Sequence, residues 1–183
     1  MNVTVYLGSN PGNDPSLGEE AGELGRRIAR GGHTLVYGGS RSGLMGLLAK
    51  GALEEGGEVI GVEPRFFVER GFQLEGLTRL IVTESMAERR TKMIELGDAF
   101  VAFPGGTGTL EEIAEVMSAV SLGRIGAPCI LYDRNGYYEG LRALLGRMIA
   151  EGLSTEERQR GILFAEDLDG IARLLERNGT DAR

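Results

Sequence analysis

Hydrophobic and polar positions follow two patterns that take turns along the chain. Short apolar runs rich in β-branched residues predict buried strands, and segments with apolar residues three or four positions apart predict amphipathic helices. The strands are expected at residues 2–7, 33–39, 58–62, 78–84, 98–103, 127–132 and 161–165. The helices are expected at residues 16–32, 43–57, 86–96, 109–122, 137–152 and 167–177. Residues 64–77 are the least regular part.

Strands that alternate with helices of this length require right-handed crossovers and a parallel sheet covered on both faces. The pattern therefore predicts an α/β fold: a doubly wound, Rossmann-like parallel sheet with three layers. The sequence of 183 residues has the size of one ordinary domain, so residues 1–183 are expected to form a single domain.

Composition narrows the function classes. The net charge of −7 disfavours a general nucleic-acid surface. No run approaches the roughly 20 apolar residues that span a bilayer, and residues 1–10 lack the features of a signal peptide, so we expect a cytoplasmic protein without a membrane partner. With one cysteine, Cys129, and one histidine, His33, neither a disulfide nor a metal site is expected.

Three glycine-rich loops follow apolar strands, at residues 8–12, 38–43 and 104–109. In a doubly wound sheet, such loops lie at the carboxyl edge of the strands, where ligands bind. None is a standard nucleotide fingerprint, because residues 38–46 lack the Lys-Ser/Thr of a Walker turn and residues 104–112 lack the third glycine of GxGxxG. Backbone N–H groups at a glycine-rich helix start form an anion site without lysine, so residues 104–109 are the candidate phosphate loop.

Two interpretations of Glu112, the carboxylate that follows this loop, are possible. Thr109 and Glu112 have the spacing of a capping box, as do Ser85 and Glu88, and Glu112 would then be a helix cap. Alternatively, Glu112 is a fixed carboxylate that stabilises positive charge on a ribose and activates water.

Several motifs together resemble the LOG ("Lonely guy") family of cytokinin riboside 5′-monophosphate phosphoribohydrolases. Residues 104–112 match the PGGxGTxxE motif, and residues 85–93, SMAERRTKM, match a second family segment. The spacing of 112 − 89 = 23 residues between Arg89 and Glu112 is that of the family. VYGGSRSGLMG at 36–46 and GYYEGL at 136–141 also match, so the likeness covers nearly the whole chain.

The resemblance implies hydrolysis of the N-glycosidic bond of a nucleoside 5′-monophosphate, AMP or an N6-modified AMP, to free base and ribose 5-phosphate. It implies a catalytic pair of Arg89 and Glu112, with no metal and no cofactor. It also implies a homodimer, for which the apolar positions on the two motif helices offer surface: Met86, Met93, Ile113, Val116, Met117 and Val120. The substrate-binding residues expected are Gly8, Ser9, Gly38, Gly39, Arg90, Gly105, Gly106, Thr107, Gly108, Thr109, Leu110, Glu111 and Ser118.

Departures from the family pattern fall at Gly71, Leu74 and Ala87, which the resemblance places toward the base, so the identity of the base stays open. One alternative function is a non-catalytic nucleotide or molybdenum-cofactor carrier, which the fold and the glycine loops would also fit. Another is the family's former label, lysine decarboxylase. That chemistry needs a desolvated lysine for a Schiff base, whereas Lys50 and Lys92 both lie on charged or early helices.

Overall fold

The computed structural model describes the backbone of residues 1–181 and the side chains of residues 1–177. Its strands are β1 Asn2–Tyr6, β2 Thr34–Tyr37, β3 Val59–Pro64, β4 Arg79–Thr83, β5 Ala99–Ala102, β6 Cys129–Tyr132 and β7 Ile162–Ala165. The helices are α1 Pro15–Arg30, α2 Gly43–Glu54, α3 Arg65–Val68, α4 Met86–Leu96, α5 Thr107–Ser121, the 3-10 helix η1 Arg134–Gly136, α6 Glu139–Ala150, α7 Glu156–Gln159 and α8 Leu168–Asp181.

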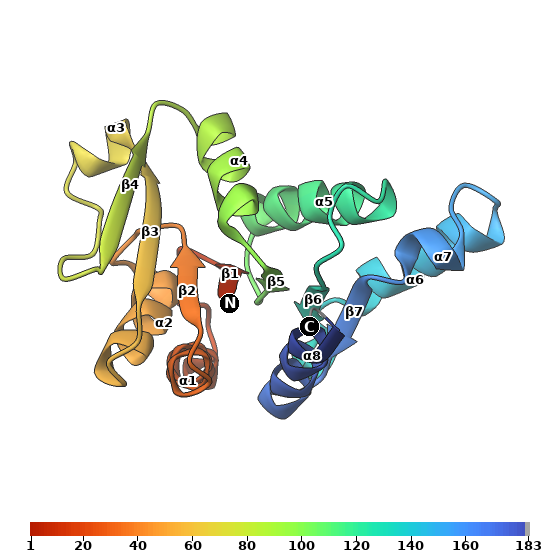
Figure 1. Cartoon of the computed structure of the whole chain (residues 1–183), viewed down its shortest axis with the longest axis horizontal. Helices are drawn as coiled ribbons and strands as arrows, with labels where there is room; N and C mark the ends of the chain where they lie inside the picture. Colours follow the sequence, from red (N-terminus) through yellow and green to blue (C-terminus); the bar gives the residue numbers. More distant parts are fainter. Residues whose placement is uncertain (182–183) are drawn as a thin grey trace.

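All seven strands form one parallel sheet in the order β4-β3-β2-β1-β5-β6-β7. The chain winds outward from β1 to β4, and α4 then carries it back to β5 on the other side of β1 (Figure 1). The strand order therefore reverses between β1 and β5. The predicted three-layer, Rossmann-like architecture is confirmed, and the reversal marks the place where such sheets bind ligands.

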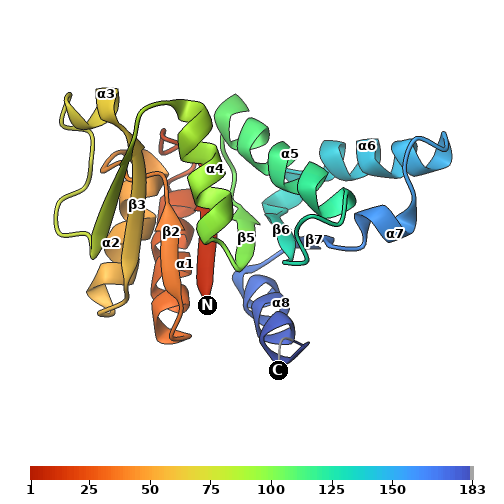
Figure 2. The same cartoon turned by 45° about the horizontal axis from the view of Figure 1, so that its top comes forward.

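Each face of the sheet has its own apolar core. Helices α1, α2 and α8 cover one face, and α4, α5 and α6 cover the other (Figure 2). Met93, Ile113, Val116 and Met117 belong to the second core and are at most 8% exposed. The sequence-based argument that these four residues supply a dimer surface is therefore wrong, because their helices turn them toward the sheet.

The strands and the long helices predicted from the pattern are all present, with ends that differ by a few residues. The largest consequence concerns α5, which begins at Thr107 with Gly106 as its N-cap and has no side-chain cap. Thr109 is thus already helical, and the capping box of Thr109 and Glu112, one of the two interpretations left open by the sequence, is absent. At α4, by contrast, the Ser85 hydroxyl does accept from the Glu88 N–H at 3.1 Å.

Candidate functional site

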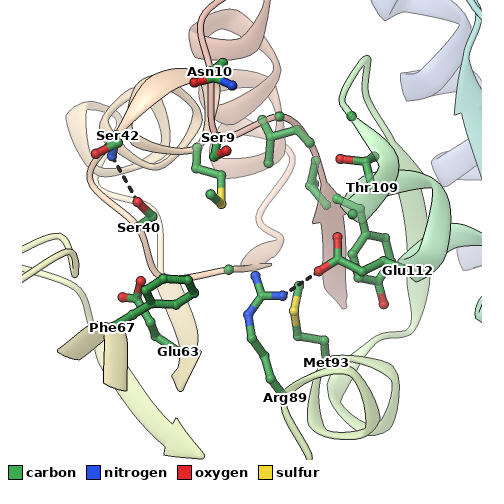
Figure 3. A pocket seen from close by; sticks show the side chains of 18 of the residues that line it. Ser9, Asn10, Ser40, Ser42, Glu63, Phe67, Arg89, Met93, Thr109 and Glu112 are labelled. Carbon is green, nitrogen blue, oxygen red and sulfur yellow. Dashed lines mark hydrogen bonds and ion pairs between the residues drawn. The ribbon is translucent and has the colours of Figure 1, made fainter. Parts of the chain in front are cut away.

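A cavity of about 610 Å³ opens at the carboxyl edge of the sheet, around the point where the strand order reverses (Figure 3). The loops after β1, β2, β3 and β5 supply its walls, together with α4 and the first turns of α2 and α5. The residues that line it are Val5, Tyr6, Leu7, Gly8, Ser9, Asn10, Gly38, Ser40, Ser42, Met45, Glu63, Phe67, Phe72, Met86, Arg89, Met93, Gly106, Thr107, Gly108, Thr109 and Glu112.

Arg89 and Glu112 form a buried ion pair in the wall of this cavity. Arg89 Nη1 donates to Glu112 Oε1 at 2.5 Å, and the two side chains are 9% and 10% exposed. Arg89 Nε donates to the carbonyl oxygen of Val62 at 2.9 Å, which ties the guanidinium to the end of β3. A Cβ at Gly38 would lie 2.0 Å from Arg89 Nη2. The glycine therefore lets the guanidinium pass close to the backbone that follows β2.

The electrostatics of the pair follow from its burial. Burial raises the pKa of the Glu112 carboxyl above its ordinary value, and the Arg89 guanidinium opposes part of that rise. The Tyr6 hydroxyl is also buried, lacks a hydrogen-bond partner and is electrostatically coupled to both side chains. A carboxylate that an arginine holds in place, with limited access to water, is a fixed negative charge able to stabilise a cation or to accept a proton from water.

The first turn of α5 forms the candidate anion site. The N–H groups of Thr107, Gly108 and Thr109 precede the first helical hydrogen bond, which Leu110 N–H donates to the Gly106 carbonyl at 3.1 Å. These N–H groups and the helix dipole favour an anion at this end of the cavity. Gly106 and Gly108 would place an added Cβ in open space, so no side chain blocks the approach.

Two tyrosines of the GYYEGL segment, residues 136–141, hydrogen-bond to the backbone at the start of the glycine-rich loop after β5. The Tyr137 hydroxyl donates to the Gly105 carbonyl at 2.5 Å, and the Tyr138 hydroxyl donates to the Phe103 carbonyl at 3.0 Å. A Cβ at Gly105 would lie 2.1 Å from Thr109 Oγ1 and 2.8 Å from the Gly8 nitrogen. The loops after β1 and β5 therefore pack so closely that no side chain fits at Gly105. This close packing fixes the position at which α5 begins.

The structure brings nine of the predicted site residues to the cavity: Gly8, Ser9, Gly38, Arg89, Gly106, Thr107, Gly108, Thr109 and Glu112. Six others do not line it: Gly39, Arg90, Gly105, Leu110, Glu111 and Ser118. Gly39 and Gly105 lie just behind its wall. Arg90 pairs with Glu111 at 3.2 Å and with Glu115 at 3.1 Å, which links α4 to α5. Leu110, Glu111 and Ser118 are exposed on α5, and Gly71, Leu74 and Ala87 also lie outside the cavity lining.

The sequence analysis missed the residues at the opposite end of the cavity from α5. Asn10, Ser40 and Ser42 belong to glycine-rich loops of which only the glycines and Ser9 were named. Phe67 and Phe72 belong to the irregular segment, whose two aromatic side chains carry no periodic signal. Glu63 is the last residue but one of β3, and its only signal in the sequence is a carboxylate directly after the apolar run at 58–62.

Cofactor and metal chemistry can be checked against the same geometry. The chain's two lysines, Lys50 and Lys92, both lie outside the cavity lining, and Lys92 pairs with Glu95 at 2.5 Å. A Schiff base in this cavity would have no lysine to form it. Among the described residues, no three His, Cys, Asp or Glu side chains are grouped to hold a metal ion, and no helix is long and apolar enough to span a membrane.

Comparison with solved structures supports the fold. The molybdenum cofactor carrier protein of Chlamydomonas reinhardtii superposes with a TM-score of 0.75 at 23% identity, over 98% of both chains. The structural-genomics target TM1055 gives a TM-score of 0.75 at 25% identity, over 97% of this chain and 99% of that one. At such sequence identities, the comparison shows that the three proteins share a backbone fold.

Sequence relatives are more informative. The family described as "Possible lysine decarboxylase" matches residues 45–175. The cytokinin riboside 5′-monophosphate phosphoribohydrolase of Rhodococcoides fascians is 43% identical over 169 residues, which cover 92% of this chain and 85% of the relative. LOG7 of Arabidopsis thaliana, of the same name, is 34% identical over 95% of this chain and 80% of its own length. The chain therefore belongs to the LOG family of cytokinin riboside 5′-monophosphate phosphoribohydrolases.

Proposed function

We propose that this protein hydrolyses the N-glycosidic bond of a nucleoside 5′-monophosphate, AMP or an N6-modified AMP, and releases the free base and ribose 5-phosphate. The relatives named above as phosphoribohydrolases support this reading. The cavity suits it as well, because an anion site at α5 and a buried carboxylate lie along one wall.

The chemistry assigns a role to each member of the ion pair. The bond between the ribose C1′ and the base nitrogen breaks, its electron pair leaves with the base, and positive charge builds on the sugar. The Glu112 carboxylate stabilises this charge and accepts a proton from the water that attacks C1′. The departing base takes up a proton from solvent, and Glu112 afterwards gives its proton to solvent, so that one water molecule is consumed overall. Arg89 holds the carboxylate in position and balances its negative charge.

The observation that carries the proposal is the Arg89–Glu112 pair itself, two charged side chains at 2.5 Å in a cavity wall. Burying an ion pair seldom adds stability over an apolar pair of the same volume, so a purely structural role explains it poorly. A non-catalytic carrier, the alternative suggested by the molybdenum cofactor carrier neighbours, needs no such carboxylate next to its ligand.

A panel of nucleotides tests this proposal. Purified protein should convert AMP or an N6-substituted AMP to free base and ribose 5-phosphate without added metal or cofactor. Adenosine should react far more slowly, on the order of 10²-fold or more in kcat/KM, because binding energy at the remote phosphate helps to fix the reacting bond. Chromatography of the products measures both rates. Equal cleavage of adenosine and AMP would contradict the phosphate assignment at α5, and binding without turnover would favour the carrier.

We also propose a two-fold homodimer that uses the outer face of α5. Leu110 lies on this helix and Leu122 is its C-cap residue, and the two are 47% and 66% exposed. Ala114 and Ser118 are also exposed between them. Residues four apart follow one side of a helix, so together they form a stripe that a second copy of the chain can cover.

Light scattering at micromolar concentration should give twice the 19.6 kDa mass of the chain. Leu122→Glu should shift the mass toward the monomer, because a second copy would bury the new charge. Leu153→Glu is the matched control, since Leu153 is 78% exposed and lies between α6 and α7, outside the stripe on α5. A wild-type mass near that of one chain would refute the dimer.

A further inference from the structure

Glu63 is a buried carboxyl group that the reaction described above does not use. It lies at the carboxyl end of β3, lines the cavity and is 2% exposed. Its Oε2 atom is buried and has no hydrogen-bond partner. An unpartnered polar atom at a cavity wall is costly unless a ligand completes its hydrogen bonding.

The fold makes specific room for this side chain. Gly39 has a φ of +85°, and a Cβ there would lie 2.8 Å from Glu63 Cβ and 2.9 Å from Oε2. The charged and titratable groups coupled to the carboxyl are Arg89 on α4 and Tyr37 on β2. Burial raises the pKa of Glu63 to about 7, and Arg89 opposes that rise. Near neutral pH, the carboxyl is therefore present in both its protonated and its ionised form.

Aromatic side chains surround this end of the cavity. Phe67 and Phe72 line it, and a backbone bridge between Ser40 and Gln73 holds their segment against the loop after β2. Arg41 N–H donates to the Phe72 carbonyl at 2.8 Å. Figure 3 shows Glu63 and Phe67 across the cavity from Thr109, with Arg89 between the two ends. A nucleotide with its phosphate at α5 and its ribose at Glu112 would thus reach Glu63 and Phe67 with its base.

We propose that Glu63 reads the edge of the base and selects one that carries an amino group beside an unprotonated ring nitrogen, as the 6-aminopurines do. This proposal rests on the proposed function for the direction in which the nucleotide lies. In its protonated form the carboxyl donates to the ring nitrogen and accepts from the amino N–H, the same pairing by which glutamine recognises adenine. In its ionised form it can only accept, so the ring nitrogen faces a negative charge. An N6-substituted adenine keeps one amino hydrogen for the contact.

Two different substitutions of Glu63 test the inference. Glu63→Gln keeps one donor and one acceptor and cannot ionise, whereas Glu63→Leu has neither. The wild-type KM for AMP should rise on the order of 10-fold between pH 6 and 8.5 as Glu63 ionises, and in Glu63→Gln this rise should be absent. The phosphate of AMP titrates in the same way for the wild type and for Glu63→Gln, so the difference between their pH profiles of KM reports on Glu63 alone. Glu84→Gln is the control, since Glu84 is exposed and pairs with Arg65.

Glu63→Leu should raise KM for AMP on the order of 10-fold or more at pH 6. It should also lose the preference for AMP over purine riboside 5′-monophosphate, which lacks the amino group. Inhibition by ribose 5-phosphate should not change, because that product lacks the base. Folding raises the pKa of the Glu63 carboxyl. Between its ordinary pKa and about pH 7, the carboxyl therefore destabilises the folded protein by an increasing amount, and the full cost remains at higher pH. Both variants should thus be at least as stable as the wild type at pH 8.

A wild-type preference for AMP that Glu63→Leu retains in full would overturn the role of Glu63. A wild-type protein that cleaves no nucleotide would instead overturn the proposed function. In that event calorimetry of AMP binding still decides on Glu63: affinity on the order of 10-fold weaker in Glu63→Leu supports the contact, and equal affinity refutes it.

Discussion

Glu112→Gln should lower the rate of nucleotide hydrolysis on the order of 10²-fold or more, the scale expected for the loss of one preorganised electrostatic group. The amide has nearly the same shape as the carboxyl, and its oxygen can still accept from Arg89 Nη1. The negative charge is lost, and with it the stabilisation of the sugar cation and the base for water. Steady-state kinetics with AMP measures the effect, while thermal unfolding and calorimetry check folding and binding.

Glu95→Gln provides the matched control on the neighbouring helix. Glu95 lies on α4, is half-exposed and pairs with Lys92, away from the cavity lining. Its substitution should leave the rate unchanged. Full activity in purified, folded Glu112→Gln would make the ion pair structural and return the chain to the carrier alternative.

Arg89→Met should abolish most activity and also destabilise the protein. The substitution leaves the Glu112 carboxylate buried without a partner, which costs about 3–5 kcal/mol if it stays ionised. Otherwise the pKa of Glu112 rises further and the group becomes neutral, which removes the catalytic charge at neutral pH. Urea unfolding at pH 7 measures the change in the free energy of unfolding, and AMP hydrolysis measures the change in rate.

The double variant Arg89→Met/Glu112→Gln separates the two effects. It should recover much of the stability lost in Arg89→Met, because no buried charge remains, yet it should stay inactive. A double variant no more stable than Arg89→Met would show that the guanidinium acts mainly through its other contact, the Val62 carbonyl.

The alternating pattern determined the architecture on its own. Apolar strands such as residues 99–102 can be buried on both faces only in a parallel sheet between helices, and the helices between them enforce right-handed crossovers. The glycine-rich loops could likewise be placed at the carboxyl edge, since every strand of a parallel sheet ends there. The motif spacing located Arg89 and Glu112, and Figure 3 shows them joined.

Only the tertiary structure decided what those side chains touch. Thr109 and Glu112 have the spacing of a capping box, but the helix begins earlier, at Thr107, because the packing of Gly105 against Gly8 places its start. Glu112 is thereby free to meet an arginine 23 positions away on another helix. Met93 and Met117 on the two motif helices face the sheet and are buried there, whereas Met86 lines the cavity. In the sequence, Glu63 is only a carboxylate next to an apolar run. The role proposed for it depends on Gly39, Phe67 and Arg89, which only the fold brings around it.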